Sequence, residues 1–366
     1  MSTRSLWRWP RPSQTDEAEL LARAARAQGT SLFAMARRRI WRDIPARIAL
    51  LGLSVLALLA LLAPLLPLAS PISLDLARGA SAPVAPWSAD WRGLWNEQYT
   101  GEHWQYGRVD QALHELRIEL FGKRQLAPLL GTDSKGRDLL ARTVFGSRTS
   151  LSAALLAALT SLLIGVGWGA VAGFVGGRLD NLMMRFVDLL YSLPFVFLVI
   201  FLVTIVAEYR SELEAGLGLD RESVFFIVLG CFYWLTMARI VRAQVLSLRT
   251  REFVTAARSL GASDTRILLT HIVPNTLPVV LVYLCLTVPS VMLFEAFLSF
   301  LGLGVEPPRV SWGLLAAEGA EALTPLSLDV WLILVPSLCI ALTLLAMNVI
   351  GDSIRDALDP RMVNKE

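Results

Sequence analysis

Charged residues are scarce in this chain. Asp, Glu, Lys and Arg make up 18% of its 366 residues, and apolar residues make up 54%, whereas a soluble domain carries about 25% charged residues. The net charge of +3 is too small to indicate a nucleic-acid partner. This composition argues against a soluble enzyme and against a nucleic-acid-binding protein.

Cysteine and histidine are also rare. The three cysteines, Cys231, Cys285 and Cys339, fall in separate apolar blocks without paired spacing, so neither a disulfide framework nor a zinc site is indicated. The chain has only three histidines. It also lacks the nucleotide-binding pattern G-x-x-x-x-G-K-[ST] and the catalytic patterns H-E-x-x-H and G-x-S-x-G. We therefore expect no catalytic residue, no metal site and no bound cofactor on this chain.

Long uncharged apolar blocks are what the sequence does contain. A helix needs about 20 apolar residues to cross about 30 Å of hydrocarbon, and six blocks meet that criterion. They are residues 48–69, 151–175, 186–207, 224–245, 277–300 and 328–350. The first block is too long for the apolar region of a signal peptide, so cleavage is not expected. The pattern predicts an all-α integral membrane protein with six transmembrane helices.

Basic residues near the ends of these blocks predict their orientation. A cluster of arginines precedes the first block: Arg37, Arg38, Arg39, Arg42 and Arg47. Because short cytoplasmic segments carry the excess of Lys and Arg, the N-terminus is expected in the cytoplasm, and six spans return the C-terminus to that side. The basic N-terminal segment could lie on anionic lipid headgroups or could serve only to set the topology.

The predicted organisation has five parts. They are a cytoplasmic basic segment (1–47), a first transmembrane helix (48–69), an external loop (70–150), a five-helix core (151–350) that contains a cytoplasmic loop (246–276), and a cytoplasmic tail (351–366). We see no internal repeat.

The cytoplasmic loop has the pattern of two short helices joined by a turn. Residues 252–260 form a helix that ends before Gly261, where a left-handed residue is expected. Ser263 or Asp264 can cap the second helix, and Pro274 marks the approach to the next span. Such a projection could dock on another protein, or it could be an ordinary amphipathic connector.

This spacing resembles the E-A-A-x3-G-x9-I-x-L-P coupling motif of ABC importer permeases. Four positions match the motif: Ala256, Ala257, Gly261 and Pro274. Three positions differ: Thr255 stands in place of Glu, His271 in place of Ile, and Val273 in place of Leu. The resemblance implies that this loop, with Asp264 in its turn, docks on an ATPase subunit.

Further stretches are similar to the oligopeptide, dipeptide and nickel permease group, and to its second, C-type subunit. They are LGTDSKGRD at 130–138, FLSFLGLG at 297–304 and DALDP at 356–360. The resemblance implies a permease for peptides or peptide-like solutes that forms half of the translocation pathway. The partners it implies are a homologous second permease, two ATPase subunits that bind ATP and magnesium, an extracytoplasmic solute-binding protein and membrane lipids.

Several charged residues have two open interpretations. Asp133, Arg137 and Asp138, with Gly136 in a turn, could form an ion-paired cap on the bundle or contact a binding protein. Glu295, inside the fifth block, could line the translocation path or form a hydrogen bond to another helix.

Asp188 is expected to pair with Arg185 at i,i+3.

Two other classes of function compete with an ATP-driven permease. A self-sufficient secondary transporter or channel predicts paired intramembrane charges, broken helices or repeats. A membrane-embedded enzyme predicts a cluster of His, Asp or Glu at one depth. The sequence has few charges in its apolar blocks and no histidine there, which argues against both classes.

Overall fold

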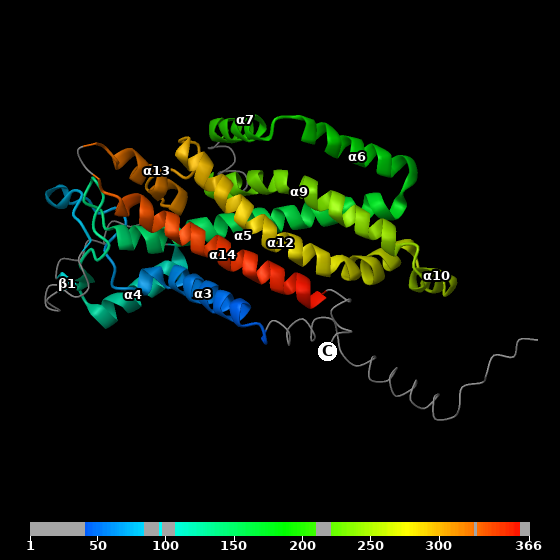
Figure 1. Cartoon of the computed structure of the whole chain (residues 1–366), viewed down its shortest axis with the longest axis horizontal. Helices are drawn as coiled ribbons and strands as arrows, with labels where there is room; N and C mark the ends of the chain where they lie inside the picture. The colour runs from blue at the N-terminus through cyan, green and yellow to red at the C-terminus, as the bar shows by residue number, and fades with distance from the viewer. Residues whose placement is uncertain (1–40, 84–94, 97–106, 210–220, 326–327, 359–366) are drawn as a thin grey trace, which may run out of the picture.

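The computed structural model describes residues 41–83, 95–96, 107–209, 221–325 and 328–358. Most of the predicted N-terminal segment and half of the predicted C-terminal tail therefore lie outside the described residues. Long helices run side by side along the longest axis of the molecule (Figure 1). The predicted all-α fold is confirmed, apart from a two-stranded sheet at one end.

The first span, α3 (Ile44–Leu61), begins earlier and ends earlier than the predicted 48–69. Pro45 occupies its first turn, where the missing N–H of proline has no intrahelical role. After Leu61 the chain forms a short 3₁₀ segment, η1 (Ala63–Leu65), because Pro64 and Pro67 cannot continue an α-helical hydrogen-bond ladder.

The segment between the first two spans forms a small cap. It contains the 3₁₀ segment η2 (Leu76–Arg78), helix α4 (Arg108–Phe121) and strand β1 (Trp95–Asn96), which pairs antiparallel with β2 (Gln125–Leu126). This cap lies at the same end of the molecule as the start of α5 and helix α13 (Trp312–Ala322) (Figure 1). The predicted external loop is thus an ordered structure in its described part.

The second span, α5 (Leu139–Val175), begins twelve residues before the predicted 151. Asp138 caps its N-terminus by accepting hydrogen bonds from the backbone N–H groups of Leu140 (2.8 Å) and Ala141 (3.4 Å). The apolar pattern did not reveal these first twelve residues of the helix, because Arg142, Thr143 and Arg148 interrupt the apolar run.

Helix α9 (Arg221–Leu248) packs closely against α5 along a row of glycines. A Cβ atom at Gly165 would lie 2.6 Å from Met237 Cβ, and one at Gly169 would lie 2.4 Å from the carbonyl oxygen of Ala238. Only glycine therefore permits this separation of the two helix backbones.

The span predicted at 186–207 is not a single straight helix. The chain forms two helices instead, α6 (Gly177–Ser192) and α7 (Phe195–Glu208), bent by 89° at the break between them. Pro194 has no N–H to donate and forces Leu193 into an extended conformation, which ends α6.

The remaining elements are α10 (Glu252–Ser259), α11 (Asp264–Arg266), the π-helical segment η5 (Ile267–Ile272), α12 (Val273–Phe300) and α14 (Trp331–Leu358). The run from Asp264 to Phe300 is one continuous helix, so the fifth span extends well beyond the predicted 277–300.

Five described helices are long and apolar enough to cross a membrane, and the bent pair α6–α7 makes a sixth if it counts as one span. The six predicted spans agree with the structure when the bent pair is counted as one span, although the bounds differ.

Candidate functional site

The two-helix loop predicted within 246–276 forms at one end of the bundle, beyond the C-terminus of α9 and the N-terminus of α12 (Figure 1). Gly261 has a φ of +81°. Its N–H donates to the carbonyl oxygen of Arg258 (3.0 Å), and the N–H of Ala262 donates to that of Ala257 (3.1 Å). These two bonds make a Schellman cap, so the predicted left-handed glycine is confirmed.

The second half of the loop begins at Ser263. Its hydroxyl accepts a hydrogen bond from the backbone N–H of Arg266 (3.4 Å), so Ser263, rather than Asp264, is the N-cap. The π-helical segment η5 follows directly and leads into Pro274. A wider π turn relaxes the hydrogen-bond ladder next to a proline that cannot donate to it.

Buried apolar residues hold this loop on the bundle. Val254 of α10 packs in one cluster with Ile267 and Ile272 of η5 and with Val245 of α9. A movement of α10 must therefore displace α9 and α12, because close-packed side chains transmit displacement.

The opposite face of the loop is exposed. Thr255, Ala256 and Gly261 are exposed, and Leu260 has 88% of its surface accessible. Arg258 and Asp264 form an exposed ion pair across the turn (3.0 Å). His271 is half-buried and Pro274 is exposed at the start of α12. Small and apolar exposed residues beside charges are suited to docking on a partner protein.

Two sets of polar contacts tie the C-terminal end of α9 to neighbouring helices. Arg242 binds both carboxylate oxygens of Asp180 on α6, at 2.5 and 2.7 Å. Arg249 Nη1 donates to the carbonyl oxygens of Gly173 (3.1 Å) and Phe174 (3.3 Å) at the C-terminus of α5. The loop is thus attached to a rigid group formed by α5, α6 and α9.

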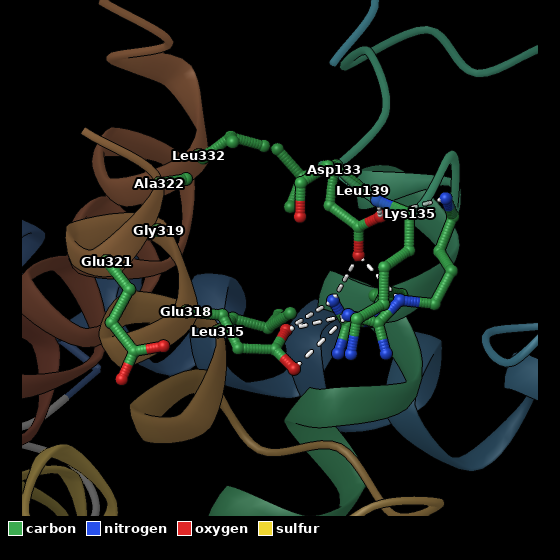
Figure 2. Close-up of a pocket in the computed structure, with 12 residues that line it drawn as sticks. Asp133, Lys135, Leu139, Leu315, Glu318, Gly319, Glu321, Ala322 and Leu332 are labelled. Carbon is green, nitrogen blue, oxygen red and sulfur yellow. Dashed lines mark hydrogen bonds and ion pairs between the residues drawn. The ribbon is translucent and has the colours of Figure 1, made fainter. Parts of the chain in front are cut away.

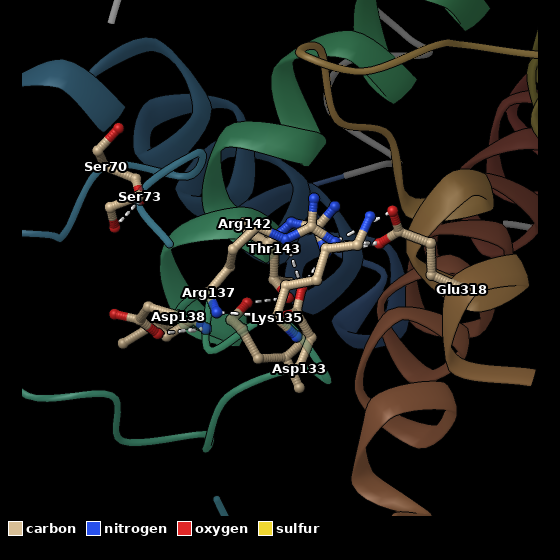
Figure 3. Close-up of polar contacts among 11 residues, drawn as sticks. Ser70, Ser73, Asp133, Lys135, Arg137, Asp138, Arg142, Thr143 and Glu318 are labelled. Carbon is tan, nitrogen blue, oxygen red and sulfur yellow. Dashed lines mark hydrogen bonds and ion pairs between the residues drawn. The ribbon is translucent and has the colours of Figure 1, made fainter. Parts of the chain in front are cut away.

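An ion cluster lies at the other end of the bundle, where the cap meets α5 and α13. Asp133 Oδ2 accepts hydrogen bonds from Arg137 Nε and Arg142 Nη1, both at 2.6 Å. Glu318 of α13 binds the same two guanidinium groups, at 2.6 Å from Arg142 and 3.0 Å from Arg137. Figure 3 shows both arginines between the two carboxylates. We refer to these four residues as the outer ion cluster.

The outer ion cluster borders a cavity of about 380 Å³ that is also lined by Lys135, Leu332 and Glu321. Figure 2 shows the carboxylate of Glu318 facing the cluster, whereas that of Glu321 points away from it. The arginine side chain at 142 is only 2% exposed, so the cluster is a buried ion-paired contact between the cap, α5 and α13.

Gly136 and Asp138 have separate roles beside this cluster. Gly136 has a φ of +74°, and a Cβ there would lie 1.8 Å from the carbonyl oxygen of Asp75. Asp138 caps α5, and its second oxygen, Oδ2, has no hydrogen-bond partner among the described residues. Burial raises the pKa of Asp138 to about 7, although its two backbone hydrogen bonds oppose that shift.

The cap hypothesis for this region is therefore consistent with the structure, which brings Asp133 and Arg137 together. Glu318 was missed because it lies 181 residues after Arg137, and no local pattern connects the two positions. Contact of Asp133, Gly136, Arg137 or Asp138 with a binding protein stays a prediction.

Glu295 is buried between α12 and the start of α13. Its Oε1 accepts hydrogen bonds from the hydroxyls of Ser299 (2.8 Å) and Ser311 (2.7 Å). Ser311 is also the N-cap of α13. These contacts favour the packing interpretation of Glu295, and a place on the translocation path stays a prediction.

The expected pair between Asp188 and Arg185 is wrong. Asp188 instead binds Arg239 of α9, at 2.7 Å. Spacing within one helix could not reveal a partner on the helix that packs beside it. No group of three or more potential metal ligands occurs in the described part of the chain.

Comparison with known proteins supports a transport function. Residues 165–364 match the family described as "Binding-protein-dependent transport system inner membrane component". The chain is 46% identical to the oligopeptide transport system permease protein OppC of Haemophilus influenzae over 231 residues, which are 63% of this chain and 70% of that protein. It is 44% identical to the dipeptide transport system permease protein DppC of Bacillus subtilis over 232 residues, which are 63% of this chain and 68% of that protein.

Proposed function

The chain belongs to the family of binding-protein-dependent transport system inner membrane components, and from this premise we propose that it is the C-type permease subunit of an ATP-driven importer of peptides or peptide-like solutes. The relatives named above are oligopeptide and dipeptide permeases. The chain is a multi-pass membrane protein and a transport subunit. It supplies half of the translocation pathway.

The observation that carries the coupling mechanism is the exposed two-helix loop with its left-handed Gly261. We propose that it docks on an ATPase subunit through Thr255, Ala256, Ala257, Gly261, Asp264, His271 and Pro274. ATP and magnesium bind to that partner. This chain binds no cofactor of its own.

In the proposed mechanism, closure of two ATPase subunits moves the loop toward its counterpart on a homologous second permease. Val254 and Ile267 transmit the movement to α9 and α12. The bonds of Arg242 and Arg249 carry it on to α6 and α5. The bundle then opens toward an extracytoplasmic solute-binding protein, which supplies the solute.

The proposed orientation follows from the arginine distribution. Residues 1–47, the loop 246–276 and the tail 351–366 are cytoplasmic, the segment 70–150 is external, and lipid surrounds the five-helix core 151–350 and the first helix. The outer ion cluster then closes the external end of the bundle.

One observation favours a different class of transporter. The 89° break between α6 and α7 is a feature of secondary transporters, which bind solute at interrupted helices. Family membership argues against this alternative. Transport by the purified chain without any ATPase would support it.

The test is affinity purification from membranes of cells that make the complete transporter. We expect an ATPase and a second permease to co-purify with the wild type, and Gly261→Trp and Ala257→Arg to lose the ATPase but keep the second permease. Gly302→Trp is a matched control, because Gly302 also has a positive φ (+74°) and open space around its Cβ position. Retention of the ATPase by both loop variants would place the docking surface elsewhere.

A further inference from the structure

A polar cluster lies along α6, α9 and α12 on a surface that the described part of the chain leaves open. Arg239 Nη2 donates to Asp188 Oδ1 at 2.7 Å, yet the two side chains are 40% and 63% exposed. The guanidinium group of Arg239 also stacks on the ring of Tyr191, 4.0 Å from its centroid. This is an exposed charged and aromatic surface formed by α6 and α9.

Hydroxyl groups extend the same surface. The hydroxyls of Tyr191 and Thr236 are hydrogen bonded to each other. The hydroxyl of Tyr233 donates to the carbonyl oxygen of Ser290 on α12 (3.0 Å), and Ser290 itself is exposed. We call Asp188, Tyr191, Tyr233, Thr236 and Arg239 the midspan cluster.

The cluster lies within the candidate spans, with the bent pair α6–α7 counted as one span. Arg239 precedes the inner end of α9, Leu248, by nine residues, which corresponds to about 14 Å of helix. Asp188 follows the inner end of α6, Gly177, by eleven residues, or about 16 Å. Both positions therefore lie well inside their helices, away from the helix ends where a charged side chain readily reaches the membrane surface.

Lipid cannot cover such a surface without a large penalty. Ionised side chains at the centre of a bilayer almost always face protein or a water-filled cavity. A second ion pair between α6 and α9 differs from this one in its burial. Asp180 is buried, and both of its oxygens bind Arg242, as expected of an ion pair that only holds helices together. Asp188 has one oxygen bonded among the described residues and is open on its other side.

We propose that the midspan cluster lines the translocation pathway and binds the free ammonium group of the transported peptide. Asp188 supplies the carboxylate. The rings of Tyr191 and Tyr233 can stabilise the cation through their faces, and the remaining N–H donors of Arg239 can bind a peptide carbonyl oxygen. This proposal rests on the proposed peptide import, and it assigns to Asp188 the pathway role that the sequence suggested for Glu295.

The experiment measures ATP-driven uptake of tri-alanine by membrane vesicles that contain the complete transporter. We expect Asp188→Asn to lower uptake at least tenfold and Asp188→Glu, which keeps the charge, to stay within about threefold of the wild type. Asp110→Asn is the matched control. Asp110 lies in α4 of the cap and pairs with Arg148 (2.7 Å), and its loss is expected to leave uptake within about twofold.

The double variant Asp188→Asn/Arg239→Gln separates recognition from structure. If the pair were only structural, the removal of both charges would leave no unpaired ion, and uptake would recover. If the carboxylate binds solute, uptake stays at least tenfold low. Recovery in the double variant, normal uptake by Asp188→Asn, or loss of the second permease from Asp188→Asn on co-purification would each overturn the proposal.

A separate measurement distinguishes failure of this inference from failure of peptide import. If the wild type takes up no tri-alanine, the proposed solute class is wrong. Labelling of Ser290→Cys by a membrane-impermeant, charged thiol reagent then still tests the surface, with the wild type as background for the three native cysteines. Labelling above background supports a water-filled path along this surface. The absence of such labelling overturns the proposal that the surface lines the pathway.

Discussion

Several buried charged residues lie near the N-terminus of α5, and most of them are ion-paired. The outer ion cluster is balanced in charge, because the carboxylates of Asp133 and Glu318 bind the guanidinium groups of Arg137 and Arg142. Asp138 is different, because only one of its oxygens is bonded among the described residues. A buried carboxylate with an open oxygen is more stable when protonated.

The pKa of Asp138 therefore gives the protein a pH-dependent stability. The folded state raises this pKa from 3.8 to about 7, so the folded chain keeps the proton over a range where the unfolded chain has lost it. Its contribution is complete below about pH 4 and is lost as the pH rises through about 7. We expect the melting temperature of the wild type in detergent to fall between pH 5 and pH 8.

The matched variant for this prediction is Asp138→Asn, which keeps a good N-cap and removes the charge. Its melting temperature should lose this fall and should exceed that of the wild type at pH 8. At pH 8 the difference in the free energy of unfolding between the variant and the wild type is at most about 4 kcal/mol. The same pH dependence in the wild type and the variant would show that Asp138 is already ionised at pH 5.

At the scale of elements, the contact between α5 and α9 depends on which face of the helix each glycine occupies. Gly165, Gly169 and Gly173 all face α9, whereas a Cβ at Gly167 would meet nothing within 4 Å. The sequence pattern could not make this distinction, because the four glycines alternate with larger residues over a single stretch of helix.

Gly169→Ala should therefore destabilise the protein and Gly167→Ala should not. The new methyl group at residue 169 would lie 2.4 Å from a backbone oxygen, and overpacking of this kind costs about 1–3 kcal/mol. At residue 167 alanine should be neutral or stabilising by up to about 1 kcal/mol, because it favours helix more than glycine does. Thermal unfolding of the two purified variants compares their stabilities directly. An equal loss of stability in both variants would contradict the close contact of Gly169 with α9.

The elements also show what the sequence could and could not predict. Apolar blocks revealed the spans, and Gly261 with Ser263 revealed the turn of the two-helix loop, because these signals are local. The break at Pro194 was overlooked because the apolar run continues on both sides of it. The partner choices of Asp188 and Glu318 could not be predicted, since each depends on contacts between segments far apart in the chain.

At the scale of the whole molecule, the two ends of the bundle differ in construction. The end that carries the two-helix loop and the C-termini of α5, α9 and α14 has an exposed projection, whereas the cap and α13 lie at the opposite end (Figure 1). This polarity suits a subunit that receives force at one membrane surface and meets solute at the other. It also makes the orientation of the chain testable.

Val109 of the cap and Arg178, at the link between α5 and α6, are exposed residues at opposite ends of the bundle. If the N-terminus is cytoplasmic, a membrane-impermeant thiol reagent should label Val109→Cys in right-side-out vesicles and Arg178→Cys only in inside-out vesicles. The native cysteines are partly buried within helices, and the wild type measures their background. The reverse pattern would place the two-helix loop outside the cell. Because ATP is supplied from the cytoplasm, that result would exclude the loop as the site of ATPase coupling, even if the fold were unchanged.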